Sequence, residues 1–469
     1  MVFTTIQFWA AFIAFLFFFA LLRKTKRELL MLYVIVASLG FFYLSNGWLM
    51  LLLPATAIIS WMLTEWMSGM KGGARKWMLF FIVLLDLLPL LFFKYAHPFS
   101  QLLEQMLATN FSLPSIALPI GISFYTFQAI SYTVDVYRRD FCLKVSFLEY
   151  LLYLSFFPLL LAGPITRAKT FFPQVRRENI VSERLLYMGL WLIILGIIKK
   201  AIVADYIAQY NDWIFTAPDA YSGFECLMGL LGFSMQIYLD FSGYSDISIG
   251  IAAMMGIRLC ENFAFPYRSR NLTEFWHRWH ISLSTWFRDY LYIPLGGNRH
   301  GLLRTCLSLL VTMTAAGIWH GSTLMFLIWG TLHGIGIAIH KACLPFLRDI
   351  RDNWLTISIS RILTLCFVVL CWAFFRSPDI DTVGQLFSAI FTRMDLSYAE
   401  PFLLARTTWC ILLAASLLSL FAGERLYRHA QAKFIHWPWL MKLLAFLFVV
   451  QMAIELHSSD IQPFLYFRF

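Results

Sequence analysis

Residues 317–334 read GIWHGSTLMFLIWGTLHG and place a histidine, His320, between two apolar runs. They belong to a stretch of 36 residues between Arg304 and Lys341 that contains no Asp, Glu, Lys or Arg. One membrane crossing needs about 20 apolar residues, so this stretch predicts two crossings that begin and end on the same side of a membrane. The turn falls near His320, where glycines on both sides let the backbone reverse, and His320 is therefore expected at the tip of a membrane hairpin.

The whole chain has the composition of an integral membrane protein. Its 469 residues are 60% hydrophobic and 14% charged, whereas a soluble domain contains about 25% charged residues. Similar apolar runs recur from one end to the other and predict an all-α polytopic membrane protein with roughly eleven transmembrane helices, plus re-entrant or interfacial helices. No repeat or flexible linker interrupts them, so residues 1–469 are expected to form a single membrane domain.

The formal net charge of +10 follows from membrane topology. The basic residues stand in short loops between apolar runs, and short loops rich in Lys and Arg stay in the cytoplasm. The cluster RKTKR at 23–27 therefore predicts an outside N-terminus and an inside loop. A nucleic-acid partner would need a solvated basic face, so none is expected.

Neither a disulfide framework nor a metal site is predicted. The eight cysteines are scattered, mostly through apolar segments, without a C-x-x-C pair. His277 and His280 could share one helix face, but Glu274 is the only oxygen ligand nearby and no H-E-x-x-H motif occurs. The motifs of serine hydrolases, P-loop enzymes and Rossmann enzymes are also missing from the sequence.

The segment 258–304 mixes arginines with Phe, Trp and Tyr and cannot be a plain membrane crossing. Its central part is typical of an interfacial or re-entrant helix that is buried against protein. Arg278 and Arg288 could bind the phosphates of a donor, or serve only as the positive charges of a cytoplasmic loop. Asp240 and Asp246 lie in the preceding apolar run, and each is a candidate partner for such an arginine.

Position alone leaves two interpretations of His320. One is a core histidine that is hydrogen-bonded to a neighbouring helix, as is also expected of His333. The other is a general base, because an imidazole titrates near neutral pH and ionisable groups inside membranes mark functional paths.

Six motifs follow one another from residue 118 onward. They are LPIGISFYTFQAISYTVDVYRRD (118–140), FFPLLLAGPITR (156–167), GIIKKAIVAD (196–205), QIYLDFSGYSDISIGIAAMMGI (236–257), NFAFPYRSRNLTEFWHRWHISLSTWFRDYLYIPLGGNR (262–299) and GIWHG (317–321). In this order they resemble the membrane-bound O-acyltransferase (MBOAT) family, in particular the branch that acetylates bacterial polysaccharides such as alginate and cellulose.

The resemblance implies a ring of helices around a central channel in the bacterial inner membrane. It assigns catalysis to His320 and gives His280 a second family position, while Trp319 is a candidate to steady the oxyanion. The donor would be acetyl-coenzyme A or a carrier-bound acyl thioester, with no permanently bound cofactor and no metal. The expected partners are the lipid bilayer, periplasmic acetylation proteins, a polysaccharide synthase complex and an acyl donor carrier.

Other functions stay open at this point. Within the family, the alternative is transfer of D-alanyl or another acyl group to a cell-wall polymer. Outside it, a proton-coupled polysaccharide transporter or flippase would also use intramembrane His and Asp, although transporters of this size often have two half-repeats, which this sequence lacks. A structural scaffold would not need His320 at all.

Overall fold

A computed structural model describes residues 6–107, 113–114, 117–177, 181–347 and 352–456. Every regular element within these ranges is helical, which confirms the predicted all-α class. Contacts between residues divide the chain into two compact units, unit 1 (Met1–Leu190 and Ile247–Cys260) and unit 2 (Trp191–Asp246 and Glu261–Phe469). Two helices, α9 (Glu183–Ile197) and α11 (Gly223–Met254), contribute residues to both units.

Unit 1 holds the N-terminal helices. They are α1 (Ile6–Leu22), α2 (Arg27–Asn46), η1 (Gly47–Leu51), α3 (Leu52–Ser68), α4 (Gly72–Leu107), α5 (Ile122–Arg138), α6 (Phe147–Ser155), α7 (Phe157–Ala162) and α8 (Ala168–Arg176). The start of α6 is capped by Ser146 and Glu149, whose side chains each bond the main-chain N–H of the other residue. Glu149 also forms ion pairs with Arg27 and with Arg176, which ties α2 and α8 to α6.

Unit 2 holds the remaining helices and the histidine hairpin. They are η2 (Ile198–Ala204), α10 (Asp205–Thr216), η3 (Pro218–Ala220), η4 (Pro266–Arg268), α12 (Leu272–Arg278), α13 (Ile281–Phe287), η5 (Arg288–Tyr292), α14 (Gly301–His320), α15 (Leu324–Leu347), α16 (Trp354–Arg376), α17 (Ile380–Thr392), η6 (Leu396–Tyr398), α18 (Ala399–Ala405), α19 (Thr407–His436) and α20 (Trp439–Glu455). Of these, η2 and η5 are π-helical, a form that is rare and frequent at functional sites.

Seven stretches of the described residues are long and apolar enough to cross a membrane. They are Arg27–Ser68, Gly72–Leu107, Glu183–Thr216, Gly301–His320, Leu324–Phe346, Trp354–Arg376 and Thr407–His436. The predicted polytopic membrane character is therefore confirmed.

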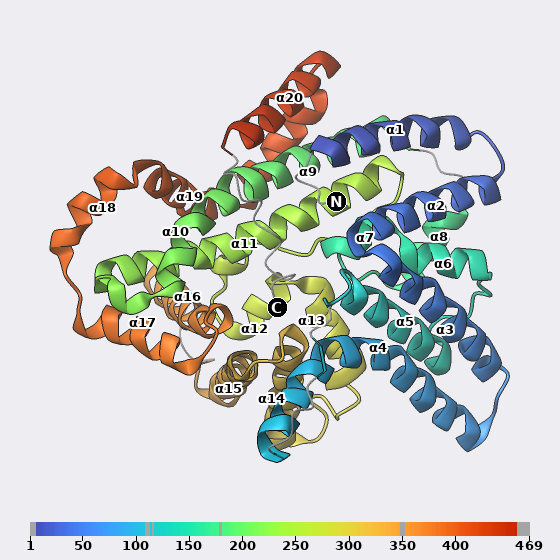
Figure 1. The fold of residues 1–469 in the computed structure, drawn as a ribbon, viewed down its shortest axis with the longest axis horizontal. Coiled ribbons are helices and arrows are strands. Elements are labelled where there is room, and N and C mark those ends of the chain that lie inside the picture. Colours follow the sequence, from blue (N-terminus) through green and yellow to red (C-terminus); the bar gives the residue numbers. More distant parts are fainter. Residues whose placement is uncertain (1–5, 108–112, 115–116, 178–180, 348–351, 457–469) are drawn as a thin grey trace. The chain divides into compact units, whose positions relative to one another are not determined.

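The helical hairpin that was predicted around His320 is confirmed. α14 ends at His320 and α15 begins at Leu324, and the two helices lie side by side (Figure 1). Glycines make this contact close: a Cβ added at Gly317 of α14 would lie 2.3 Å from the main-chain oxygen of Phe326, and one added at Gly330 of α15 would lie 2.4 Å from that of Met313. Such backbone approach through small residues is how helices pack in membranes.

The centre of the arginine-rich segment holds α12 and α13, of seven residues each, and η5, which follows α13 directly, where a single interfacial or re-entrant helix was expected. Asn271 caps the start of α12 by accepting a hydrogen bond from the N–H of Glu274 at 2.8 Å. The two helices meet at a bend formed by Trp279 and His280, and both of these side chains are buried.

Candidate active site

His320 is the last residue of α14 and is 5% exposed. Its imidazole meets aromatic rings from two further helices, Trp329 of α15 at a centroid distance of 5.0 Å and Phe375 of α16 at 5.2 Å. Both contacts are edge to face, the arrangement that aromatic rings prefer. The tip of the hairpin thus holds the ring of His320 in a fixed, largely apolar setting.

His280 lies at the bend between α12 and α13 and is fully buried. Its backbone has φ 42° and ψ 56°, a left-handed conformation that costs a non-glycine residue about 1–2 kcal/mol. Residues held in such conformations cluster at active sites. Burial lowers the pKa of His280 below its usual value, so its imidazole is neutral at pH 7.

Trp319 connects the two histidines. Its ring lies 4.7 Å from that of His320 and 6.4 Å from that of His280, measured between centroids. All three residues belong to unit 2, so the structure brings together the two predicted catalytic histidines and the predicted oxyanion residue. The contact between position 280 and position 319 joins residues that are 39 positions apart in the sequence, so local sequence patterns do not reveal it.

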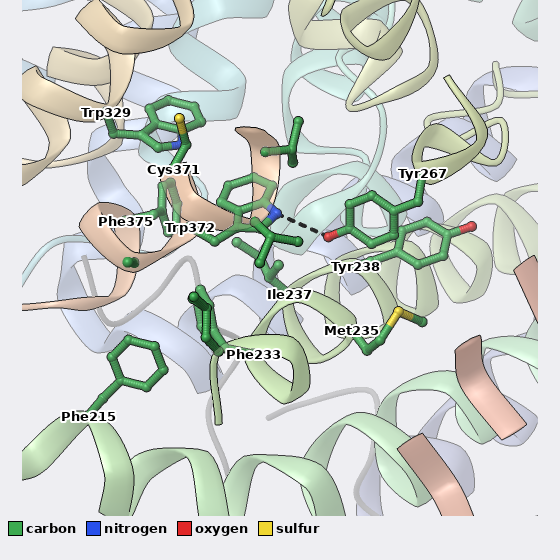
Figure 2. Close-up of a cluster of buried hydrophobic side chains, with 14 of the residues drawn as sticks. Phe215, Phe233, Met235, Ile237, Tyr238, Tyr267, Trp329, Cys371, Trp372 and Phe375 are labelled. Atoms are coloured by element: carbon green, nitrogen blue, oxygen red, sulfur yellow. Dashed lines mark hydrogen bonds between the residues drawn. The ribbon is translucent and has the colours of Figure 1, made fainter. Parts of the chain in front are cut away.

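A core of aromatic side chains packs against His320 and against Trp279, the neighbour of His280. Trp372 of α16 stacks on Trp329 at a centroid distance of 5.9 Å and lies 5.0 Å from Trp279, the neighbour of His280. Its indole N–H donates a hydrogen bond of 3.1 Å to the hydroxyl of Tyr267, the dashed line in Figure 2. Trp329 and Phe375 stand beside Trp372 in the same view. Sequence reasoning missed this core, since its rings come from four separate segments.

His333 belongs to the same core. It is fully buried, its ring lies 5.0 Å from that of Trp329, and its Nδ1 accepts a hydrogen bond of 3.3 Å from the indole N–H of Trp276. The expectation of a hydrogen-bonded core histidine is confirmed here.

The two candidate donor-binding arginines have different surroundings. The guanidinium of Arg278 forms an ion pair of 2.8 Å with Glu274 and donates to the main-chain oxygen of Ala264 at 3.1 Å. Arg288 pairs with its neighbour Asp289 at 2.9 Å, and 54% of its side chain is exposed. Arg278 therefore helps to hold the bend, whereas the charge of Arg288 faces outward.

Asp240 and Asp246, which the sequence offered as candidate partners of an arginine, form ion pairs with lysines. Asp240 forms an ion pair with Lys200, which also binds Asp205 at 2.7 Å, and Asp246 binds Lys199 at 2.6 Å. Both lysines lie in η2, and each of them binds an acid of α11. The feature of the sequence that could have predicted these ion pairs is the pair Lys199 and Lys200, which stands in the apolar run before Asp205.

No group of three His, Cys, Asp or Glu side chains within the described ranges could hold a metal ion. Glu274, His277 and His280, the combination considered from the sequence, do not form such a group, and the carboxylate of Glu274 accepts a hydrogen bond from Arg278. No disulfide joins any two of the eight cysteines, all of which lie within the described ranges.

A buried histidine at the tip of a glycine-packed membrane hairpin, with a second buried histidine beside it, is an arrangement suited to acid–base catalysis on acyl groups within a membrane. Residues 31–377 match the MBOAT, membrane-bound O-acyltransferase family. The chain belongs to this family, as the sequence motifs predicted, and it is an acyltransferase.

Among curated proteins, the chain is similar to the "Probable alginate O-acetylase AlgI" of Pseudomonas putida, with 34% identity over 92% of this chain and 97% of the relative. The protein of the same name from Pseudomonas syringae is 36% identical over 77% of this chain and 74% of the relative. A "Peptidoglycan O-acetyltransferase" of Helicobacter pylori is 33% identical over 79% of this chain and 75% of the relative.

Proposed function

We propose that this protein moves an acetyl group from a cytoplasmic thioester across the bacterial inner membrane to a hydroxyl of an exported polysaccharide. The acceptor is an alginate- or cellulose-like polymer, reached directly or through a periplasmic partner. The observation that carries the proposal is the placement of His320 and His280, both buried, on either side of Trp319. The alginate O-acetylases among the relatives support acetyl as the group transferred.

His320 is the general base of this mechanism. Its neutral imidazole takes the proton from the acceptor hydroxyl while the oxygen attacks the thioester carbonyl. The C–S bond then breaks, the new C–O ester bond remains, and the proton passes from His320 to the leaving thiolate. In the proposed mechanism, an N–H group of Trp319 or His280 stabilises the negative charge that forms on the carbonyl oxygen; the contacts of the Trp319 ring with both imidazoles support this assignment.

The donor is acetyl-coenzyme A or an acyl group on a carrier, a substrate and not a resident cofactor. Arg288, with its exposed guanidinium, is the better placed of the two arginines to meet a phosphate, and Arg278 contributes by holding the bend. Periplasmic acetylation proteins, a polysaccharide synthase complex and the donor carrier are the proposed partners, together with the surrounding lipid.

The proposed architecture is a single membrane-bound O-acyltransferase domain, residues 1–469, with a ring of helices around a central channel. A total of roughly eleven crossings requires more than the seven candidate stretches. Arg27–Ser68 contains two helices, and α1, α5, α11 and α20 are long enough to supply the others.

The test is made in the native host, with the chromosomal copy replaced by His320→Ala or His320→Gln. Polymer-bound, base-labile acetate is measured and divided by the amount of this protein in the membrane. Loss of a general base lowers the rate by about 10²- to 10⁴-fold, and Gln fails as well because its amide cannot accept the proton. His333→Ala is the control: it leaves a cavity in the core and lowers the protein level, yet retains substantial activity per molecule.

Three results would contradict the proposal. Normal acetate from His320→Ala rules out His320 as the base. D-alanyl ester on a cell-wall polymer in place of acetate identifies the alternative acyl group. Loss of polymer export without loss of acetyl ester on the remaining polymer indicates a flippase.

A further inference from the structure

Asn262 lies against the start of α13 and is 1% exposed. Its main-chain oxygen accepts a hydrogen bond of 2.9 Å from the N–H of Ile281. Its side-chain Oδ1 accepts two more from Ser282, one from the N–H at 3.2 Å and one from the hydroxyl at 2.9 Å. Because the first N–H groups of a helix have no partner within the helix, Asn262 supplies the partners of the first two residues of α13.

The same segment also bonds the other side of the bend. The N–H of Ala264 donates to the main-chain oxygen of Arg278, the last residue of α12, at 3.0 Å. Asn262 and Ala264 therefore hold the chain just after and just before His280. The bend can adopt its left-handed conformation because both flanking residues are fixed to one short segment.

A third contact links Asn262 to α11. Its side-chain amide donates to the hydroxyl of Ser245 at 3.2 Å, and Ser245 is itself buried. One helical turn earlier on α11 stands Phe241, whose ring meets the imidazole of His280 edge to face at 4.5 Å. The helix that contacts the ring of His280 is thus the helix to which Asn262 is tied.

We infer that Asn262 is a positioning residue for acyl transfer: its hydrogen bonds to Ser282, Ile281 and Ser245 fix the bend that directs the imidazole of His280 toward Trp319. This inference rests on the proposed function, in which His280 acts beside His320. A strained backbone conformation persists only where its surroundings determine it. The hydrogen bonds of Asn262 fix the residues just after the bend, where the hydroxyl of Ser284 also donates to the main-chain oxygen of Trp279 at 3.1 Å. Asn262 itself touches no reacting atom.

The test is a double-mutant cycle between Asn262→Ala and His280→Ala. Cells are fed [¹⁴C]acetate, and the initial rate of base-labile label on the exported polymer is divided by the membrane level of the protein. Because displacement of a catalytic group by about 1 Å costs about 10²-fold, Asn262→Ala is expected to lower this rate by about 10- to 100-fold. In the His280→Ala background, Asn262→Ala is expected to cause no further loss, since its effect passes through His280. If the double variant instead loses rate by the product of the two single losses, the inference is overturned.

A conservative variant separates positioning from folding. In Asn262→Asp the carboxylate keeps both acceptor contacts to Ser282, and the hydroxyl of Ser245 can rotate to donate to the other oxygen. We expect Asn262→Asp to have more than a third of the wild-type rate per molecule. If Asn262→Ala does not accumulate in the membrane, the double-mutant cycle is run with Ser282→Ala in its place. A rate with Asp as low as that with Ala, at equal protein level, counts against the inference.

The matched control is Asn211→Ala. Asn211 is also fully buried in unit 2, and its amide also donates to a side chain on α11, that of Gln236, at 2.8 Å. Its replacement is expected to lower the protein level while the rate per molecule stays within about threefold of wild type. If both asparagine variants lose the same amount of rate, the loss in Asn262→Ala reflects the removal of any buried asparagine and not the positioning of His280.

The two proposals fail in different ways. If His280→Ala transfers acetyl at the wild-type rate, the role of His280 in the proposed function is wrong, and the inference about Asn262 falls with it. If His280→Ala is impaired while Asn262→Ala is not, the proposed function stands and only the inference about Asn262 is overturned.

Discussion

Gly317→Ala adds one methyl group between α14 and α15, three residues before His320. The new Cβ would lie 2.3 Å from the main-chain oxygen of Phe326 and 3.0 Å from the Cα of Gly330. Both of these atoms belong to backbone, so no side chain can rotate away to make room. The substitution therefore acts on the distance between the two helices of the hairpin.

The size of the effect follows from that geometry. Ordinary van der Waals contact of a Cβ begins at 3.4 Å, so α14 and α15 must move apart by about 1 Å near Gly317. A displacement of about 1 Å at a catalytic group costs about 10²-fold in rate. Overpacking lowers stability by about 1–3 kcal/mol. The higher helix propensity of Ala relative to Gly offsets about 1 kcal/mol of this loss. We expect Gly317→Ala to insert into the membrane and to lose most of its activity.

The assay is polymer-bound acetate per molecule of membrane protein, together with thermal unfolding of the detergent-solubilised protein. Gly384→Ala is the matched control, because Gly384 also lies in a helix of unit 2 and a Cβ there meets no atom within 4 Å. The control is expected to keep the wild-type rate and stability. A wild-type rate from Gly317→Ala would refute the view that close backbone contact at the hairpin sets the position of His320.

Two further predictions concern charged residues. Lys200→Met removes the buried cation that pairs with Asp240 and Asp205. We expect a loss of about 3–5 kcal/mol of stability, measured by thermal unfolding. An unchanged unfolding temperature would show that the ion pairs are dispensable. Arg288→Glu is expected to raise the acetyl-coenzyme A concentration for half-maximal transfer in membranes about tenfold, because a charged hydrogen bond to the donor is lost. The amount of protein in the membrane is expected to stay normal. An unchanged half-maximal concentration would show that Arg288 does not bind the donor.

The hairpin and its histidine could be predicted because their signal is local. An uncharged stretch of 36 residues is too long for one crossing and has the right length for two, and a glycine on either side of the Trp–His pair marks the turn. The structure places the end of α14 at His320 for the same reason: Gly321 follows, and its missing side chain leaves room for the ring of Phe326. No information from distant residues was needed.

The partners of Asp240 and Asp246 could not be predicted in this way. Asp240 and Lys200 are 40 residues apart, and Asp246 and Lys199 are 47 residues apart, so their pairing depends on which face of η2 meets α11. The arginines of the segment 258–304 were equally plausible partners by charge alone. The lysines pair instead because they stand on the helix that packs beside these acids, and packing is a property of the fold.

His280 illustrates the same limit within the site. Its sequence neighbours mark a helix, and an unbroken helix over 272–287 would be the simplest interpretation of them. The chain instead bends at His280, and the N–H groups of Ile281 and Ser282 donate to Asn262, 18 residues before His280. A hydrogen bond between separate segments thus overrides local helix propensity.

Besides the aromatic core that they share, each histidine depends on a contact of its own, and this bears on how the site can change. The backbone contact of α14 with α15 sets His320, while hydrogen bonds from Asn262 set His280. Trp319 is the residue in contact with both rings, and it is covalently joined to His320. A shift of α14 therefore moves Trp319 and His320 together relative to His280, whereas a change at the bend moves His280 alone. The distance between His320 and His280 is therefore a quantity that both sets of contacts affect.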